Sequence, residues 1–372
     1  MGSHGAYGDF AARAAAGESA VLKRHLRRIA GVPGTGLGIV SWPAAAGHRL
    51  TLRWHFWWQA HLLDCAVDAA LRDPDAAHRR RVATLVRSIR LRNLGRFTND
   101  YYDDMAWIGL ALQRAAAVGS GRPADVRRIV TRILDAWSPS VGGIPWRTGD
   151  DYYNAPANGP AAILLARNGF GFQARRLADW MDAFLRVPGS DLIADGFHPG
   201  KPLLPVYYSY CQGVVLGAEL ELAESGGDRI RVHRLVDAVD RKLATHGVLS
   251  GHGGGNQGLF TGILVRYLAL VATSLPGNTP ADQQTRATAR ELVLNSAESA
   301  WQNRIDVAGA PLFGVDWSTG ATMPRPGRAP RTHDADVEAS AQAERDLSVQ
   351  LSGWMVMEAA ATLQRAALPA AD

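Results

Sequence analysis

The feature of this sequence that most restricts its fold is a helical spacing of apolar residues that continues along nearly the whole chain. Strand-type alternation bounded by turn signals is scarce, so the sequence predicts an all-α protein. Glycine and proline divide the chain into about twelve helical segments. These segments are 8–30, 52–71, 75–92, 99–118, 123–137, 155–168, 171–187, 206–224, 228–245, 256–274, 280–303 and 344–366.

Successive segments differ in character. Segments 75–92 and 228–245 are amphipathic and rich in arginine, whereas segments 52–71 and 256–274 are apolar or aromatic almost all round. A helix that is apolar on every side is enclosed, and a helix with a charged stripe faces water. The sequence therefore predicts inner helices that alternate with outer ones.

The connections alternate as well. The link after an inner helix is tight, as at 73–75, and most links before an inner helix are long, as at 138–154 and 304–343. The long loops should gather at the end of the molecule where the inner helices begin, and such loops are usually functional. Six hairpins of this kind predict an (α/α)6 barrel, a single domain over residues 1–372 in which residues 1–7 are disordered or tag-derived. A helical-repeat solenoid is the alternative, but its repeats would resemble one another.

Composition and charge exclude several classes of protein. Hydrophobic residues make up 47% of the chain and charged residues 20%, which is typical of a globular protein with a sizeable core. The net charge is +5, and its arginines are spread over several amphipathic segments, so we expect no nucleic-acid partner. No apolar run reaches about 18 residues, so we expect no membrane span. The two cysteines, Cys65 and Cys211, lie in apolar stretches and are predicted to be buried free thiols.

The start of the chain does not resemble a signal peptide. As encoded, the sequence therefore predicts a cytoplasmic protein, or an extracellular one if a leader has been removed.

Aromatic, amide and acidic residues concentrate where the inner helices are predicted to begin. Sugars need this combination, because their C–H faces pack on aromatic rings and their hydroxyl groups need directional hydrogen bonds. The candidate substrate-binding residues are Trp57, Trp58, His61, Asn99, Tyr102, Trp107, Trp146, Asn158, Tyr210, Gln212, Asn256 and Trp317.

Asp103 and Asp104 are the sharpest candidates for catalysis. Glycoside hydrolysis needs two carboxyl groups, and neighbours on a first helical turn suit the roughly 5–5.5 Å of a retaining mechanism better than the 6.5–9.5 Å of an inverting one. Acidic residues in a first turn also stabilise the helix dipole, which is the non-catalytic alternative. A second pair, Asp150-Asp151, is interpreted as a solvated turn and helix cap. His55 and His61 do not have the spacing of a zinc site, and we expect no metal or cofactor.

These motifs resemble glycoside hydrolase family 76, the endo-α-1,6-mannanases, over roughly residues 50–365. The resemblance implies an (α/α)6 barrel that cleaves α-1,6-linked mannan, or a mannan-cored glycolipid such as lipomannan, with retention. It assigns Asp103 as the nucleophile and Asp104 as the general acid/base. The residues that carry it are Asn99-Asp100-Tyr101-Tyr102-Asp103-Asp104-Met105-Ala106-Trp107, Trp57-Trp58-Gln59-Ala60-His61, Gly142-Gly143-Ile144, Tyr208-Ser209-Tyr210 with Gln212-Gly213, Arg266-Tyr267-Leu268 and Gln350-Leu351-Ser352-Gly353-Trp354-Met355.

The chain departs from the pattern of this family at four positions. Cys211 stands where the family usually has Asn, Thr261 where it has Lys, and Tyr153 and Asn256 where Lys and Asp are expected. These changes keep the carboxylate pair but alter polar groups around it. Two alternatives to hydrolysis therefore remain, a transglycosylase and a mannan-binding protein without catalysis. A terpene synthase is disfavoured because the DDxxD motif lacks its third Asp.

Overall fold

The computed structural model describes residues 8–44, 54–203, 205–223, 229–325 and 342–367. Within these residues the chain forms twelve α-helices and four two-stranded sheets. Some predictions lie outside the described residues, namely the disorder or tag origin of 1–7 and the helix ends placed at 52–53, 224 and 228.

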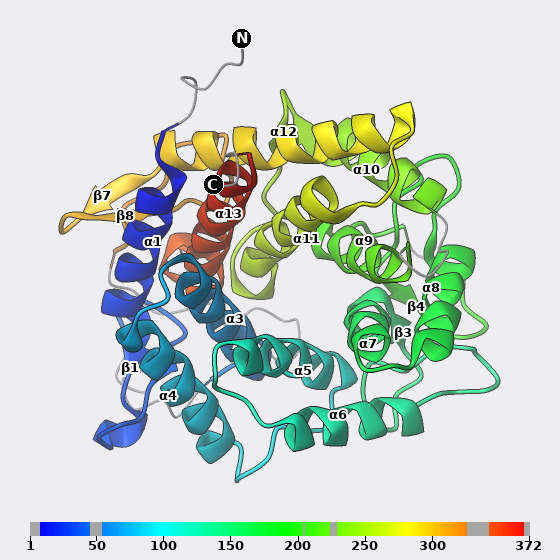
Figure 1. Cartoon of the computed structure of the whole chain (residues 1–372), viewed down its shortest axis with the longest axis horizontal. Helices are drawn as coiled ribbons and strands as arrows, with labels where there is room; N and C mark the ends of the chain where they lie inside the picture. The colour runs from blue at the N-terminus through cyan, green and yellow to red at the C-terminus, as the bar shows by residue number, and fades with distance from the viewer. Residues whose placement is uncertain (1–7, 45–53, 204, 224–228, 326–341, 368–372) are drawn as a thin grey trace, which may run out of the picture.

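Six helices form an inner ring (Figure 1). Each packs against the next one in the ring, and α13 packs against α3, so the ring closes. Closure excludes the open solenoid and confirms the predicted (α/α)6 barrel. The inner helices are α3 (Phe56–Arg72), α5 (Tyr102–Ala117), α7 (Ala155–Arg167), α9 (Ser209–Ala223), α11 (Phe260–Ser274) and α13 (Leu347–Ala366).

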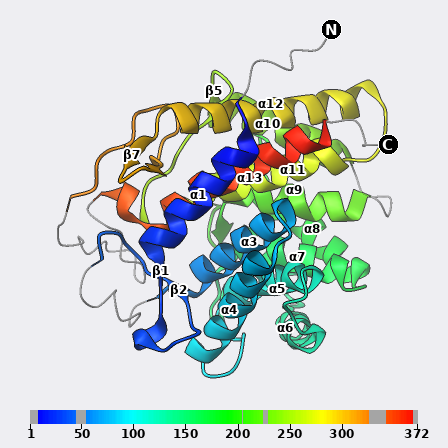
Figure 2. The same cartoon turned by 60° about the vertical axis from the view of Figure 1, so that its left-hand side comes forward.

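The outer ring covers the inner one. Five outer helices follow the inner helix on which they pack, whereas α13 is covered by α1, which comes from the other end of the chain (Figures 1 and 2). The outer helices are α1 (Phe10–His25), α4 (Ala76–Arg92), α6 (Pro123–Asp135), α8 (Gly171–Leu185), α10 (Arg229–Leu243) and α12 (Pro280–Gln302).

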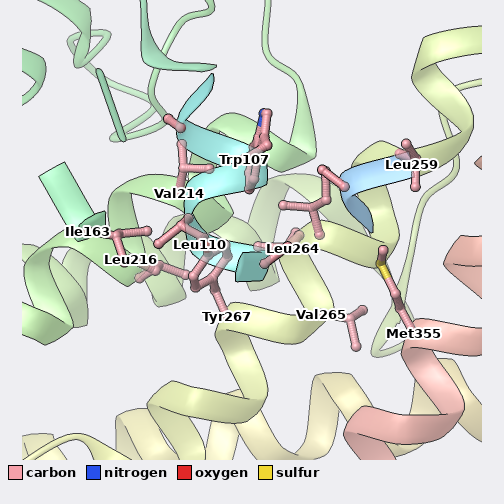
Figure 3. Packing of buried hydrophobic residues seen from close by; sticks show 14 of the residues in the cluster. Trp107, Leu110, Ile163, Val214, Leu216, Leu259, Leu264, Val265, Tyr267 and Met355 are labelled. Carbon is pink, nitrogen blue, oxygen red and sulfur yellow. The ribbon is translucent and has the colours of Figure 1, made fainter. Parts of the chain in front are cut away.

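The pattern of burial explains the two rings. Outer helix α6 starts with a proline at its first turn and buries only one stripe, which includes Ile129 and Ile133. Inner helix α13 is buried on almost every side, and its Trp354 is fully enclosed. Figure 3 shows side chains of several inner helices, among them Leu110 of α5, Val214 of α9 and Leu264 of α11, packed together in this core.

Glycine allows the inner helices to approach one another closely. A Cβ on Gly213 of α9 would lie 2.9 Å from the Cα of Leu264 on α11, and one on Gly159 of α7 would lie 2.4 Å from Val214 on α9. Any larger residue would therefore push the neighbouring inner helices apart.

The predicted gathering of the long loops at one end is confirmed. Each strand belongs to a connection that leads from an outer helix to an inner one, and we call this end of the molecule the loop end and the opposite end the rear end. The paired strands are β1 (Leu26–Arg27) with β2 (Leu37–Gly38), β3 (Tyr153–Asn154) with β4 (Gly196–Phe197), β5 (Ala244–Thr245) with β6 (Val248–Leu249), and β7 (Ile305–Val307) with β8 (Ala310–Leu312). The loop end also holds the 3-10 turns η1 (Ile29–Gly31), η2 (Gly255–Leu259) and η3 (Ala343–Arg345).

Inner helix α11, together with the turn before it, is unusually apolar. In the described part of the chain, Gly255–Ser274 is the one stretch long and apolar enough to cross a membrane by length and composition alone. It packs against α9, α12 and α13, and 67% of its most apolar window is buried inside the protein. Its composition is therefore accounted for by its place in the inner ring.

Candidate active site

Asp103 and Asp104 lie in the first turn of α5 at the loop end, and both side chains are partly buried. Oδ1 of Asp103 accepts a hydrogen bond from the backbone N–H of Asp104 at 2.7 Å, and Oδ2 accepts one from Nε1 of Trp146 at 2.9 Å. Oδ2 of Asp104 accepts a hydrogen bond from Nδ2 of Asn99 at 2.5 Å. Neither carboxylate forms an ion pair with a described residue. The two acids are therefore neighbours without a neutralising cation.

The surroundings raise the pKa of both acids, but unequally. Burial raises the pKa of Asp103 to about 6, while its hydrogen bonds from Trp146 and from the backbone of Asp104 limit the rise. Burial, followed by the charge of Asp103, raises the pKa of Asp104 well above its ordinary value, and the hydrogen bond from Asn99 only partly opposes this. Like charges at one site cannot both ionise easily. Near neutral pH the pair therefore holds an ionised Asp103 and a protonated Asp104.

The loop between α6 and α7 fixes Trp146 beside the pair. The backbone C=O of Trp146 accepts a hydrogen bond from the N–H of Tyr102 at 2.9 Å, and the N–H of Trp146 donates to the C=O of Tyr152 at 2.7 Å. The ring of Trp146 meets that of Tyr101 edge-on, with centroids 5.2 Å apart. Tyr102 itself is only 8% exposed, and its hydroxyl accepts from Thr148 at 3.4 Å. Trp146 therefore contacts Asp103 directly, whereas Tyr102 supports the loop that carries Trp146.

A third carboxylate, Asp195, was missed by the sequence analysis. It lies in the loop before α9, where it accepts hydrogen bonds from the hydroxyls of Tyr152 at 2.6 Å and Tyr210 at 3.1 Å. Burial raises its own pKa, and its charge contributes to the raised pKa of Asp103, so it belongs to the same site. No motif in the sequence distinguishes this acid from the other acidic residues of the loops.

An aromatic group lines the same end of the barrel. The ring of Tyr210 stacks on Phe260 with centroids 3.9 Å apart and planes 1° apart, and Tyr208 lies 5.0 Å from Phe260. Tyr210 was predicted to bind substrate and is partly exposed beside Asp195. Phe260 was not predicted, because aromatic residues on inner helices are usually part of the core.

Asn256 joins two tryptophans at the start of α3. Its Oδ1 accepts hydrogen bonds from Nε1 of Trp57 at 3.0 Å and from Nε1 of Trp58 at 3.1 Å. Trp57 and Asn256 are partly exposed, whereas Trp58 is fully buried. The structure therefore leaves Trp57 available for a sugar and gives Trp58 a positioning role in place of the predicted contact.

His61 and Trp107 lie deeper in the barrel than the acids. His61 is 3% exposed, and its ring lies 5.5 Å from that of Trp57 and 4.6 Å from that of Trp107. Burial lowers the pKa of His61 to about 3, so it is neutral. The two rings therefore pack against each other inside the barrel.

Three other predicted substrate contacts are enclosed and serve the loops instead. Asn158 is fully buried and bonds the N–H and C=O of Ile144 at 2.8 Å each. Gln212 is fully buried and bonds both backbone groups of Ile193 in the same way. Trp317 is only 2% exposed. The hydrogen-bonding capacity of the two amides is used by the loops that carry Trp146 and Asp195, so these residues position the site without reaching a sugar.

The four departures noted in the sequence have clear places in the structure. The thiol of Cys211 donates to Oδ1 of Asp195 at 3.4 Å, and Thr261 donates to the C=O of Ser250 at 3.1 Å. Tyr153 is buried in β3, and Asn256 holds the two tryptophans. Both cysteines are buried free thiols, as predicted.

The remaining acidic groups have structural roles. Asp150 accepts from Nε of Arg147 at 2.9 Å and from the N–H of Tyr152 at 3.1 Å, which confirms the predicted turn. The predicted helix cap is wrong, because Asn154 caps α7 by accepting from the N–H of Ala157 at 3.1 Å. One group of three potential metal ligands occurs in the described residues, at Asp73, Asp75 and His78 on the surface. Asp75 caps α4 there by accepting from the N–H of His78 at 2.7 Å, which accounts for its position without an ion.

Comparison with known families agrees with this geometry. The sequence profile of glycosyl hydrolase family 76 matches residues 17–352. The chain belongs to glycosyl hydrolase family 76, and it is a glycoside hydrolase by membership. No curated protein matches it.

Solved structures share the fold over almost the whole chain. The Lin0763 protein of Listeria innocua superposes with a TM-score of 0.79 at 23% identity, covering 96% of this chain and 98% of that one. The α-1,6-mannanase GH76A of Salegentibacter sp. HEL1_6 gives a TM-score of 0.77 at 26% identity, covering 95% and 100%. An inactive variant of that mannanase, with two consecutive aspartates replaced by asparagine, is known in complex with α-1,6-mannotriose, with a TM-score of 0.76 at 25% identity over 95% and 100%.

Proposed function

We propose that this glycoside hydrolase is a retaining endo-α-1,6-mannanase. The observation that carries the proposal is the pair Asp103 and Asp104, two adjacent acids that have no cation beside them among the described residues and whose pKa values are raised to different extents. The similarity to GH76A supports the substrate, and the inactivity of that enzyme when two consecutive aspartates are replaced supports the choice of residues.

In the first step Asp103 acts as the nucleophile. Its ionised carboxylate attacks the anomeric carbon, and the bond to the leaving glycosidic oxygen breaks. Asp104 gives its proton to that oxygen. Oδ1 of Asp104 accepts no hydrogen bond from a described residue, whereas Oδ2 is held by Asn99, so Oδ1 is the oxygen that carries the proton.

In the second step Asp104 is ionised and acts as the base. It removes a proton from water, the water oxygen attacks the anomeric carbon, and the ester bond to Asp103 breaks. The carboxylate of Asp103 is released and Asp104 is protonated again. Because the anomeric carbon is displaced twice, the product keeps the anomeric configuration of the substrate.

Digestion of linear α-1,6-mannan, with the products identified by mass, tests the proposal. Wild type should release a range of oligosaccharides early in the reaction, as an endo enzyme does. Asp104→Asn should lower the rate by about 10²–10⁴-fold, the usual contribution of a general acid, and Asp103→Asn should lower it at least as much. Asp100→Asn is the matched control, because Asp100 is an exposed acid in the same segment and should keep wild-type turnover.

Turnover by both site variants at the rate of Asp100→Asn would contradict the assignment. Binding of mannan by wild type without cleavage would identify a binding protein, and products longer than the substrate would identify a transglycosylase. Proton NMR of the first product should show the α-anomer. Lipomannan, digested in parallel, tests whether a mannan-cored glycolipid is cut as well.

A further inference from the structure

A cavity lies inside the barrel, and neither of the two acids lines it. Its volume is about 410 Å³, within the roughly 300–1,000 Å³ typical of small-molecule sites. Its walls come from α3, α5, α11 and α13, with Arg167 at the end of α7, and they reach from His61 and Trp107 to the exposed Thr362 at the rim. We call it the rear cavity, because these helices run from the loop end to the rear end. Figure 3 shows Trp107, Leu110, Tyr267 and Met355 of its lining around the barrel axis.

Apart from Arg365 at the exposed rim, the charged groups in the wall of the rear cavity are paired within the protein. Arg266 bonds Asp68 at 2.6 Å and Asp64 at 3.2 Å, and Arg114 bonds both of these acids. Glu358 is paired with Arg72 at 3.1 Å. An ionic guest would find no unpaired counter-charge among these groups and would lose its hydration, which is costly. The wall therefore favours a neutral guest.

Two buried polar atoms in the same wall lack a partner. Nε2 of His61, a side chain only 3% exposed, and Nε of Arg266 form no hydrogen bond with any described residue. Buried polar groups are nearly always hydrogen-bonded, so each unsatisfied one needs an explanation. A hydroxyl group can donate to a neutral imidazole nitrogen and accept from a guanidinium N–H. The indole of Trp107 and the ring of Tyr267 offer apolar faces beside them.

We propose that the rear cavity is a second binding site that holds one neutral polyhydroxylated molecule of about the size of a hexose. The guest bonds His61 and Arg266 through hydroxyl groups and places a C–H face on the aromatic rings. Neither Asp103 nor Asp104 lines the rear cavity, so it is distinct from the proposed site of hydrolysis. The proposal does not depend on the proposed function, because its evidence lies in the rear half of the barrel.

The test uses methyl α-D-mannopyranoside as the probe and the full chain carrying Asp103→Asn and Asp104→Asn. Saturating α-1,6-mannotriose is added to occupy the loop end, and binding of the probe is titrated by saturation-transfer NMR. We expect saturable binding that mannotriose does not displace. Ala269→Phe, which fills the rear cavity from α11, should weaken it at least tenfold. Ala287→Phe is the matched control, because it adds the same ring on the exposed side of α12 and should change nothing.

Four outcomes would overturn the proposal. Mannotriose could displace the probe, which would place all binding at the loop end. Ala269→Phe could bind as well as Ala287→Phe, or the probe could fail to bind, either of which would leave a water-filled space. Sulfate, titrated in place of the probe, could bind and be lost in Ala269→Phe, which would identify an anion site. If Ala269→Phe does not fold, Thr362→Trp blocks the exposed rim and takes its place.

The two proposals fail separately. If mannotriose does not bind, the proposed substrate is in question, but the difference between Ala269→Phe and Ala287→Phe still decides whether the rear cavity is a site.

Discussion

Two pairs of aspartates lie on inner helices of the same barrel, and they differ in one respect. Asp103 and Asp104 at the loop end have no described cation beside them, whereas Asp64 and Asp68 in the rear half share Arg114 and Arg266. Burial by itself raises the pKa of both Asp64 and Asp103. At Asp64 the charges of Arg114 and Arg266 outweigh burial and lower the pKa to about 2, while at Asp103 burial prevails and the pKa rises to about 6. Among the described residues, arginines therefore distinguish the ion-paired acids of the rear half from the acids that we propose to be catalytic.

The largest effect that tests this comparison is the removal of a cation from the rear pair. Arg266→Met should destabilise the protein by about 3–5 kcal/mol, because it leaves buried carboxylates short of a partner. Urea unfolding measures the change. The control is Arg241→Met, which breaks an exposed pair with Asp237 at 2.8 Å and should cost at most about 1 kcal/mol. Equal losses in the two variants would mean that the rear pair is not held by its arginines.

Replacing an acid at the loop end should have the opposite effect on stability. Folded Asp103 binds its proton more tightly than the unfolded chain does, so wild type loses stability as the pH rises from about 4 to 6. Asp103→Asn removes this loss and should be more stable than wild type by about 2 kcal/mol at pH 8, with little difference at pH 4.

Asp64→Asn is the matched comparison for the pH dependence. The pKa of Asp64 is lowered, so its contribution is present above its ordinary pKa and is lost as the pH falls toward about 2. Asp64→Asn should therefore be less stable than wild type at neutral pH. Urea unfolding at several pH values gives both differences, and the comparison fails if the two variants change in the same direction.

A smaller effect is expected from the hydrogen bond that Trp146 donates to Asp103. Trp146→Phe removes a group that favours the ionised carboxylate, so the pKa of Asp103 should rise further. The acid limb of the kcat/KM profile should move to higher pH by less than about one unit. Trp137→Phe, at the end of α6 where Arg176 lies 4.0 Å from the ring, is the control and should leave the limb in place.

The smallest expected change is a shift of the acid limb of the kcat/KM profile to lower pH, opposite to the shift expected for Trp146→Phe. Asp195→Asn keeps an acceptor for Tyr152 and Tyr210 but removes the negative charge that helps to raise the pKa of Asp103. The acid limb should move to lower pH by a few tenths of a unit, about what a distant like charge produces. A shift to higher pH would show that Asp195 acts on Asp103 through geometry and not through charge.

The alternation of charge and the loop lengths were enough to predict the architecture, because they are local in the sequence. Helix starts were less predictable. The helix predicted from residue 99 begins at Tyr102, because Asn99 accepts from the N–H of Tyr101 and Tyr102 donates to Trp146 from a distant loop. The first helix ends at His25, five residues before the predicted 30, because Leu26 and Arg27 pair with β2. In both places, contacts between distant residues decide the boundary.

Contacts between distant residues also explain why only part of the candidate site was predicted. Motifs placed Asp103, Asp104, Asn99 and Trp146 at one end of the barrel, and these four are joined by hydrogen bonds. They could not show whether an amide such as Asn158 faces a substrate or a loop. Asp195 stayed hidden because its role depends on the folding of one long loop beside another.

The pairing of α1 with α13 has a consequence for biosynthesis. The ribosome makes α1 before any other helix of the barrel, and the inner helix that it covers emerges last. Throughout translation, the face of α1 that packs on α13 therefore lacks this partner, although α3 and β8, which α1 also contacts, are made earlier. Shutting the ring is the final event, so a nascent chain stalled before α13 cannot reach the native state.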